Sequence, residues 1–551
     1  MRLFQFLFFI AAFLFMSSCG VKQSLSDRPN LTGIEKIDTT RIKHNDSTFS
    51  IGNNSLIKNK YGVWELYVEG NALQRGLVTG SLTRELMHKQ ERALMEKIGT
   101  LVPSQGYQKF LSKAINFFNR KMYLHIPEEY KAEIYGVSRF ALEEYDSFAP
   151  PYIRALYLHG AHDIGHALQD LMLVGCTSFA AWDTKTADGQ LLLGRNFDFY
   201  VSDEFSEEKI AAFINPSEGH KFMMFTWGGM IGVVSGMNEK GLTVTINAGK
   251  SRIPMIAKTP ISLVAREILQ YAETTAEAIE IAKKREVFVS EAIMIGSAAE
   301  RKAILIEVAP NNLGVYEVEN TNRLICSNHF QSDAYLDDYR NLNTQKESHT
   351  TYRFNRMQEL VEEGEILTPA KAAEILRNKE GMGGESIGLG NEKAINQLLA
   401  HHGIIFKPEE NMVWISSNPY QLGAFIAYDL EEAFGKFMDG GFKGSVADEE
   451  LTIPEDDFVN SQVFKNYGEF RKLKEEILSK EYQVEDSKIL RLMAVNPDNW
   501  KAWSIAGEYY YLNEEYKKAV IHFKQALKRE VTTLPDERWL ENMIKKSYRK
   551  F

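Results

Sequence analysis

Residues 175–199 of this 551-residue chain read GCTSFAAWDTKTADGQLLLGRNFDF, and they carry the densest chemical signal in the sequence. Cys176 opens an apolar run that is typical of a β-strand, a turn follows at residues 188–189, and a second apolar run returns from it. The returning strand is predicted to place Arg195 and Asp198 opposite the cysteine. Because an arginine beside a thiol favours the reactive thiolate, the pattern predicts a nucleophilic cysteine.

Together with three later segments, this run resembles the N-terminal-nucleophile (Ntn) hydrolases related to isopenicillin N acyltransferase, penicillin V acylase, bile salt hydrolase and acid ceramidase. Those enzymes share a mature start at Cys-Thr-Ser, a hairpin, and Arg-Asn-x-Asp on its second strand, all of which occur here. The later matches are residues 236–247, which end in Asn247; residues 327–330, which contain Asn328; and residues 352–356, which contain Arg353. In order and approximate spacing, the resemblance covers residues 175–430.

The resemblance implies an α+β fold, a four-layer αββα Ntn-hydrolase sandwich, and a cysteine that becomes a new N-terminus. The thiol of Cys176 would attack the carbonyl of Gly175, and water would resolve the thioester. The freed α-amino group would then act as general base for its own thiol. The resemblance also implies a role for each of the other residues. Asp198 would orient the amine, and Arg195 would stabilise the thiolate. Asn247 and Asn328 would stabilise the oxyanion, and Arg353 would support the site or contact a substrate carboxylate.

The implied activity is cleavage of a linear, non-peptide amide C–N bond in a small N-acyl substrate, without a cofactor or metal. Acyl transfer to another acceptor stays open as a second activity, although water is the default acceptor. The family acts on penicillins, conjugated bile salts, ceramides and N-acyl amino acids, so the acyl group is left open. Aromatic residues at 197, 199 and 200 indicate an apolar acyl group.

The first 18 residues have the form of a secretory signal peptide, with Arg2 followed by an apolar run from Leu3 to Met16. This run is shorter than the ~20 residues that span a bilayer. The junction before Cys19 resembles a bacterial lipoprotein signal, which implies a lipid on Cys19 and a bacterial cell-envelope location facing the periplasm or exterior. The alternative is plain secretion, with Cys19 lost or unpaired.

Changes of composition and periodicity divide the chain into five regions. Residues 19–57 are polar, show no sustained periodicity and read as a mobile tether. Apolar spacings of three and four then predict helices over residues 80–101, 107–120, 127–145 and 150–173. The expected regions are a signal peptide at 1–18, the tether at 19–57, a helical prosegment at 58–175, a catalytic domain at 176–440 and a helical region at 441–551. Retention of the prosegment as a bound subunit is left open.

Beyond Cys176, short β-type runs occur in blocks separated by helices, which predicts sheets covered by helices rather than an alternating βαβ fold. The glycine-rich residues 381–390 are expected to form a flexible loop, and the acidic residues 448–457 a linker. Near the C-terminus, six residues fit the spacing of a tetratricopeptide (TPR) repeat: Trp503, Gly507, Tyr510, Ala519, Phe523 and Ala526. A single TPR-like unit favours a packing appendage over an array that binds a protein partner.

The net charge of -10 argues against nucleic acid as a partner, because phosphate binding needs a basic face. The three cysteines are Cys19, Cys176 and Cys326. Cys326 lies in an apolar run and is expected to pack in the core, with a Cys176–Cys326 disulfide as the alternative.

Two other functions compete with the cysteine hydrolase. His162 and His166 lie four residues apart, share a helix face with His159 and could form a zinc hydrolase site, although aspartate stands where that pattern needs its glutamate. The non-enzymatic alternative is an envelope lipoprotein with a degenerate core, whose TPR-like region binds a partner. That alternative predicts an uncut chain.

Overall fold

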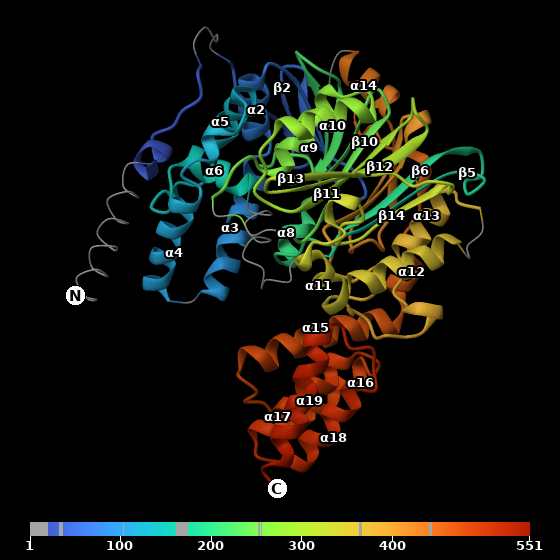
Figure 1. Cartoon of the computed structure of the whole chain (residues 1–551). Helices are drawn as coiled ribbons and strands as arrows, with labels where there is room; N and C mark the ends of the chain where they lie inside the picture. Colours follow the sequence, from blue (N-terminus) through green and yellow to red (C-terminus); the bar gives the residue numbers. More distant parts are fainter. Residues whose placement is uncertain are drawn as a thin grey trace.

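The computed structural model of the chain describes residues 20–31, 37–102, 104–160, 175–251, 254, 256–362, 366–439 and 444–551. Two β-sheets form the centre of the molecule, helices cover them, and a further group of helices lies at the C-terminal end (Figure 1). This mixture of helix and sheet agrees with the expected α+β class. The signal segment with Cys19, and His162 and His166, lie outside the described residues.

The larger sheet has 11 strands in the order β1-β2-β3-β4-β7-β8-β9-β10-β11-β12-β13. Its neighbours pair antiparallel, except that β4 and β7 run parallel with Trp64 opposite Ile210. Its strands are β1 (Ile42–Asn45), β2 (Thr48–Ile51), β3 (Asn54–Lys58), β4 (Trp64–Gly70), β7 (Ile210–Pro216), β8 (Phe222–Thr226), β9 (Ser235–Asn238), β10 (Leu242–Ala248), β11 (Glu291–Ser297), β12 (Lys302–Ala309) and β13 (Asn312–Tyr316).

The smaller sheet has 7 strands in the order β14-β5-β6-β15-β16-β17-β18, all paired antiparallel. Its strands are β14 (Arg323–Cys326), β5 (Thr177–Asp183), β6 (Gly189–Phe197), β15 (His402–Lys407), β16 (Met412–Ser416), β17 (Phe425–Asp429) and β18 (Asp448–Ile453).

The two sheets share one buried apolar cluster, to which β6 contributes Leu191 and Leu193 and β7 contributes Phe213. Leu192, between those two leucines, belongs instead to the cluster on the other face of the smaller sheet. Successive side chains of a strand point to opposite faces, so β6 is buried on both. This explains why the run at 191–193 is continuously apolar rather than alternating.

Helices cover the outer face of each sheet. The larger sheet packs against α2 (Ala72–Leu82), α5 (Glu128–Ser138), α9 (Ile261–Tyr271) and α10 (Thr275–Lys284), and the smaller against α12 (Thr350–Glu362) and α13 (Pro369–Leu376). The other helices around the sheets are α3 (Arg84–Leu101), α4 (Gln105–Phe118), α6 (Pro151–His159), α8 (Asp203–Glu207), α11 (Tyr339–Glu347) and α14 (Leu430–Met438). Thus α3 and α4 agree with the predicted helices, α5 and α6 agree with the first parts of theirs, and residues 161–173 of the last prediction lie outside the described residues.

The N-terminal region differs from the expected tether and purely helical prosegment, because residues 42–70 supply four strands to the larger sheet. β2 is buried throughout, and β4 is covered on both faces. The first three strands have only four or five residues each, which is too short for a visible period of two. The part of the expected tether from residue 42 onward therefore belongs to the folded body of the protein.

The acidic linker expected at residues 448–457 is also partly wrong. Its first half forms β18, which pairs with β17 through Phe425 opposite Ile453, so the smaller sheet extends past the predicted boundary at residue 440. β18 is the last strand in the order of its sheet, and none of its side chains is fully buried. Charged side chains are common on edge strands, which is why this one resembles a linker in sequence.

The C-terminal helices are α15 (Gln462–Ser479), α16 (Asp486–Val495), α17 (Trp500–Leu512), α18 (Tyr516–Ala526) and α19 (Leu534–Tyr548), and they gather at one end of the molecule (Figure 1). Where α17 meets α18, a Cβ on Gly507 would lie 2.5 Å from the Phe523 ring. The glycine-rich segment expected to be flexible is packed against this group. A Cβ on Gly388 would lie 2.2 Å from the backbone nitrogen of Asn499, so glycine is required for the contact.

Candidate active site

The predicted hairpin is present and places the cysteine at the start of a central strand. Cys176 directly precedes β5, which pairs with β6 so that Ser178 lies opposite Arg195. On its other side β5 pairs with β14, where Cys326 lies opposite Ser178. The turn uses Gly189 with φ +74°, a conformation that favours glycine.

The Cys176 thiol is completely buried, and a guanidinium nitrogen of Arg195 donates to its Sγ at 3.6 Å. Burial is nevertheless the larger influence and raises the pKa of the thiol to about 11, while Arg195 lowers it. Arg195 therefore lowers the pKa of the thiol as expected, but it does not offset the effect of burial. In the continuous chain the thiol keeps its proton at neutral pH.

A string of buried polar side chains holds Arg195. Its guanidinium donates to Ser235 Oγ at 2.6 Å, and Ser235 Oγ lies 2.9 Å from His402 Nε2. His402 Nδ1 in turn lies 2.9 Å from Nδ1 of His401. The Ser235 hydroxyl therefore accepts from Arg195 and shares a hydrogen bond with His402, which shares another with His401. Burial lowers the pKa of both imidazoles well below the ordinary value, which keeps this string neutral.

The Asp198 carboxylate is fully buried, with no well-formed hydrogen bond from the described residues to either oxygen. Burial raises its pKa to about 7, while Arg353, Arg195 and the amide of Gln421 lower it. The backbone carbonyl of Asp198 accepts from the N–H of Gly175 at 3.2 Å, so this residue adjoins the predicted cleavage point. A buried carboxylate without hydrogen bonds is costly, and a nearby cation would relieve that cost.

The two predicted oxyanion asparagines meet at the end of β10, where Asn247 is the second-last residue. Ser178 Oγ donates to Asn247 Oδ1 at 2.9 Å, and Arg353 donates to Asn328 Oδ1 at 2.6 Å. The Asn328 amide nitrogen donates to the carbonyl of Ala248 at 2.9 Å, which joins the second asparagine to the residue after the first. Asn247 Nδ2 likewise donates to the carbonyl of Cys326 at 3.5 Å, so each amide uses one N–H within the protein and keeps a second N–H for a substrate.

Arg353, on α12, is completely buried, and all three of its guanidinium nitrogens donate within the protein. Besides Asn328, it donates to the carbonyl of Cys176 at 2.8 Å, to Thr177 Oγ1 at 2.5 Å and to His349 Nδ1 at 3.0 Å. Of the two expectations for Arg353, this geometry favours support of the site over contact with a substrate carboxylate.

The bond between Gly175 and Cys176 is enclosed by polar groups. The Gly175 carbonyl accepts from Gln397 Nε2 at 3.2 Å, and a Cβ at position 175 would lie 2.7 Å from that nitrogen. Gln397, Ser235 and His402 are absent from the predicted site. They lie in segments without a recognisable motif, and only the folding of the two sheets brings them to Cys176.

The remaining cysteine and histidine predictions have mixed outcomes. Cys176 and Cys326 are both free thiols, and Cys326 is buried in the core as expected. His159 is buried with Nδ1 2.8 Å from the Ala155 carbonyl and Nε2 accepting from the backbone of Ile231 at 3.0 Å. Both of its nitrogens thus have partners within the protein.

Over the described ranges, no three or more histidine, cysteine, aspartate or glutamate side chains stand together as a metal site. Within the same ranges, no helix combines the length and apolar character needed to cross a bilayer.

The profile of one protein family, described as acyl-coenzyme A:6-aminopenicillanic acid acyl-transferase, matches residues 184–414. The match begins after Gly175 and Cys176 and includes the other predicted catalytic residues: Arg195, Asp198, Asn247, Asn328 and Arg353.

Two curated relatives share about half of the chain. An uncharacterized protein from Archaeoglobus fulgidus is 24% identical over 274 residues, which are 46% of this chain and 45% of that protein. Protein dcd1B from Dictyostelium discoideum is 23% identical over 295 residues, which are 50% of this chain and 55% of that protein. The chain spans about half the length of these relatives.

Two solved structures are similar to part of the chain. One is the Caenorhabditis elegans N-acylethanolamine-hydrolyzing acid amidase ortholog, with a TM-score of 0.31 and 18% identity, covering 42% of this chain and 93% of that one. The other is a variant of the conjugated bile acid hydrolase from Clostridium perfringens, with a TM-score of 0.31 and 15% identity, covering 50% of this chain and 99% of that one.

Proposed function

We propose that the chain is a cysteine Ntn hydrolase that cuts itself between Gly175 and Cys176 and then cleaves the linear amide bond of an N-acyl substrate. The observation that carries the proposal is the buried set of groups around Cys176. Arg195 donates to its Sγ and Arg353 to its carbonyl, and the Asp198 carboxylate lies beside them without a full set of hydrogen bonds. The family match, which covers these partners, supports the same class of chemistry.

Self-cleavage is the first step of the proposed mechanism. Sγ of Cys176 bonds to the carbonyl carbon of Gly175 as the C–N bond breaks, and the thiol proton passes to the departing nitrogen. Water then hydrolyses the thioester, leaving a carboxylate on Gly175 and a free thiol and amine on Cys176. Before the cut, the buried thiol with its raised pKa is a poor nucleophile toward an external substrate, so the precursor is a zymogen.

The cut supplies a cation that can donate hydrogen bonds to the buried carboxylate of Asp198. The new ammonium group of Cys176 pairs with Asp198, and in its neutral form it takes the proton from its own thiol as Sγ attacks the substrate carbonyl. The amides of Asn247 and Asn328 stabilise the oxyanion, each by ~3 kcal/mol. The amine of the substrate leaves with the proton held by Cys176, and water releases the acyl group. Transfer of that group to another amine is the acyltransferase variant of the same step.

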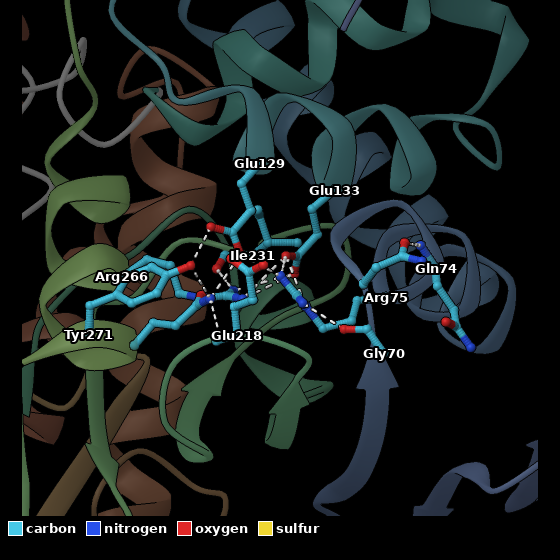
Figure 2. Close-up of polar contacts among 11 residues, drawn as sticks. Gly70, Gln74, Arg75, Glu129, Glu133, Glu218, Ile231, Arg266 and Tyr271 are labelled. Atoms are coloured by element: carbon cyan, nitrogen blue, oxygen red, sulfur yellow. Dashed lines mark hydrogen bonds and ion pairs between the residues drawn. The ribbon is translucent and has the colours of Figure 1, made fainter. Parts of the chain in front are cut away.

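The prosegment is proposed to remain bound after the cut, because a buried charge network joins it to the catalytic domain (Figure 2). Glu133 on α5 pairs with Arg75 of α2 at 2.6 Å and with Arg266 of α9 at 3.2 Å. Glu129, four residues before Glu133 on α5, accepts from the Tyr271 hydroxyl of α9 at 2.7 Å. Figure 2 shows the two carboxylates of α5 pointing between these side chains. Separation of the fragments would leave buried charges unpaired.

An apolar acyl group is the proposed substrate feature. Phe197, at the end of β6, stacks on Phe199 with ring centroids 5.7 Å apart, and Trp227 stacks on Phe199 at 6.0 Å. Phe205 packs against Trp227 at 5.4 Å, so four aromatic rings gather beside the hairpin that carries Arg195 and Asp198. Aromatic faces of this kind suit an acyl chain better than a charged group.

Three finer features belong to the same proposal. The helix–sheet–sheet–helix packing supports a four-layer αββα arrangement of the Ntn-hydrolase type. The close approach of α17 and α18 at Gly507 supports a TPR-like helix pair that serves as an appendage. Cys19 carries a lipid that anchors the protein in the bacterial cell envelope. Substitution Cys19→Ala tests the anchor, which is refuted if the protein still partitions to membranes and takes up labelled fatty acid as before.

Intact-mass measurement and N-terminal sequencing of the wild type and Cys176→Ala test the central proposal. The wild type should contain a fragment that begins Cys-Thr-Ser, and the variant should stay uncut at that bond. An uncut wild type, or a variant cut at the same place, would refute self-cleavage. A panel of N-acyl amides differing in chain length and amine then tests the amidase activity.

A further inference from the structure

The hydrogen bond between Gln397 and the Gly175 carbonyl points to a role in self-cleavage. We infer that the side-chain amide of Gln397 is the oxyanion donor for the self-cleavage step, separate from the Asn247 and Asn328 pair that serves the substrate. The inference rests on the proposed function. It assigns to the self-cleavage step a catalytic group that is absent from the predicted site.

The geometry matches the charge that this step develops. When Sγ of Cys176 bonds to the carbonyl carbon, the Gly175 oxygen takes up the electron pair of its double bond and becomes negative. Gln397 Nε2 already lies 3.2 Å from that oxygen in the uncut chain. An N–H donor stabilises an alkoxide more strongly than a ground-state carbonyl, so the interaction lowers the barrier rather than only binding the peptide. When the C–N bond breaks, the electron pair returns to the carbonyl.

Glycine at position 175 is what allows this approach. A Cβ there would lie 2.7 Å from Nε2 and 3.3 Å from Oε1 of Gln397. Any larger residue would push the amide away from the carbonyl oxygen that it contacts. The glycine before the nucleophile therefore makes room for the donor as well as for the attacking thiol.

The segment that carries Gln397 is held firmly on both sides. Leu398, the next residue, is buried and has φ +53°, a conformation that a leucine rarely adopts. Its N–H donates to Asn396 Oδ1 at 2.9 Å, and its carbonyl accepts from the hydroxyl of Tyr467 on α15 at 3.3 Å. Unfavourable backbone conformations persist where the surroundings enforce them. The C-terminal helices thus help to position the donor.

The test follows cutting of the full-length chain made by cell-free translation with a short pulse of labelled methionine. Substitution Gln397→Leu removes the donor and should slow cutting about 100-fold, as loss of one oxyanion donor does. Gln397→Glu carries a donor only when protonated, so its cutting rate relative to wild type should rise as the pH falls. A residue that merely stabilises the fold would not give that pH dependence.

Gln90→Leu is the matched control, because Gln90 is also buried and its amide donates to a backbone carbonyl, that of Phe205, at 3.0 Å. It should be cut at the wild-type rate. Equal cutting of wild type and Gln397→Leu would overturn the inference and leave self-cleavage standing. Equal slowing by both leucine substitutions would also overturn it, since the effect would then be structural. A wild type that is never cut would refute the proposed function and the inference together.

Discussion

Asp198 should make the stability of the uncut precursor depend on pH. Its pKa is about 7 against an ordinary 3.8, and burial is the main cause. A raised pKa means that the folded protein favours the protonated carboxyl. The resulting stabilisation is fully present below about pH 4 and is lost as the pH rises through about 7. Three pKa units correspond to about 4 kcal/mol of unfolding free energy. In Asp198→Asn this group no longer titrates, so its contribution to the unfolding free energy should not change with pH.

The comparison uses the uncut variant Cys176→Ala with and without Asp198→Asn. Unfolding in urea is followed from pH 4 to pH 8, and the stability of the aspartate form should fall relative to the asparagine form over that range. Parallel curves would refute the reasoning, because they would mean that the carboxyl titrates normally. In the mature enzyme, the new ammonium of Cys176 should lower the pKa of Asp198 by about 1–3 units. The infrared band of the protonated carboxyl at pH 6 should therefore lose at least about half of its intensity after cutting.

Three further substitutions test the groups around the site and the prosegment. Arg353→Met should reduce self-cleavage about 100-fold by mass spectrometry, because the Cys176 carbonyl loses the donor that positions the bond to be cut. Arg353→Lys should not restore cutting, because one ammonium cannot replace the guanidinium fork. Ser235→Ala should lower the amidase rate about 10-fold by releasing Arg195, at a cost typical of one hydrogen bond. Glu133→Gln should destabilise the protein by about 3–5 kcal/mol and release the cut prosegment in size-exclusion chromatography.

Each of these substitutions has an outcome that would contradict it. Unchanged cutting in Arg353→Met would mean that the carbonyl contacts do not matter to the reaction. An unchanged rate in Ser235→Ala would show that the strand alone orients Arg195. For Glu133→Gln, the control is Glu280→Gln, whose exposed partner is Lys283 at 2.8 Å and whose loss should change neither stability nor fragment association.

The parts of the candidate site that could be predicted from the sequence are those that lie in contiguous motifs. The hairpin and its arginine are readable because Cys176, Arg195 and Asp198 lie within one run of 25 residues (175–199). The supporting groups are not readable in this way. Gln397 and His402 reach the cysteine from more than 200 residues further along the chain, through the pairing of β15 with β6. No spacing rule connects positions that meet only across a sheet.

The errors in the fold have a similar physical origin. Strands β1 to β3 are too short to show a period, and β18 is polar because it lies at the end of its sheet. Their sequences are ordinary for a tether and a linker, and only pairing with a neighbouring strand makes them part of a sheet. By contrast, α3 to α6 are long enough for their apolar spacing to be visible, and they occur close to where the spacing predicts them.

The parallel pairing of β4 with β7 has a consequence for refolding of the chain after the proposed cut. β4 precedes the proposed cleavage point and β7 follows it, and their register runs from Trp64 opposite Ile210 to Gly70 opposite Pro216. The precursor can complete this sheet within one chain, but the mature enzyme would have to complete it from two. Recovery of the denatured mature enzyme should therefore depend on protein concentration, whereas recovery of the precursor should not. Self-cleavage would turn a protein that refolds alone into one that must reassemble.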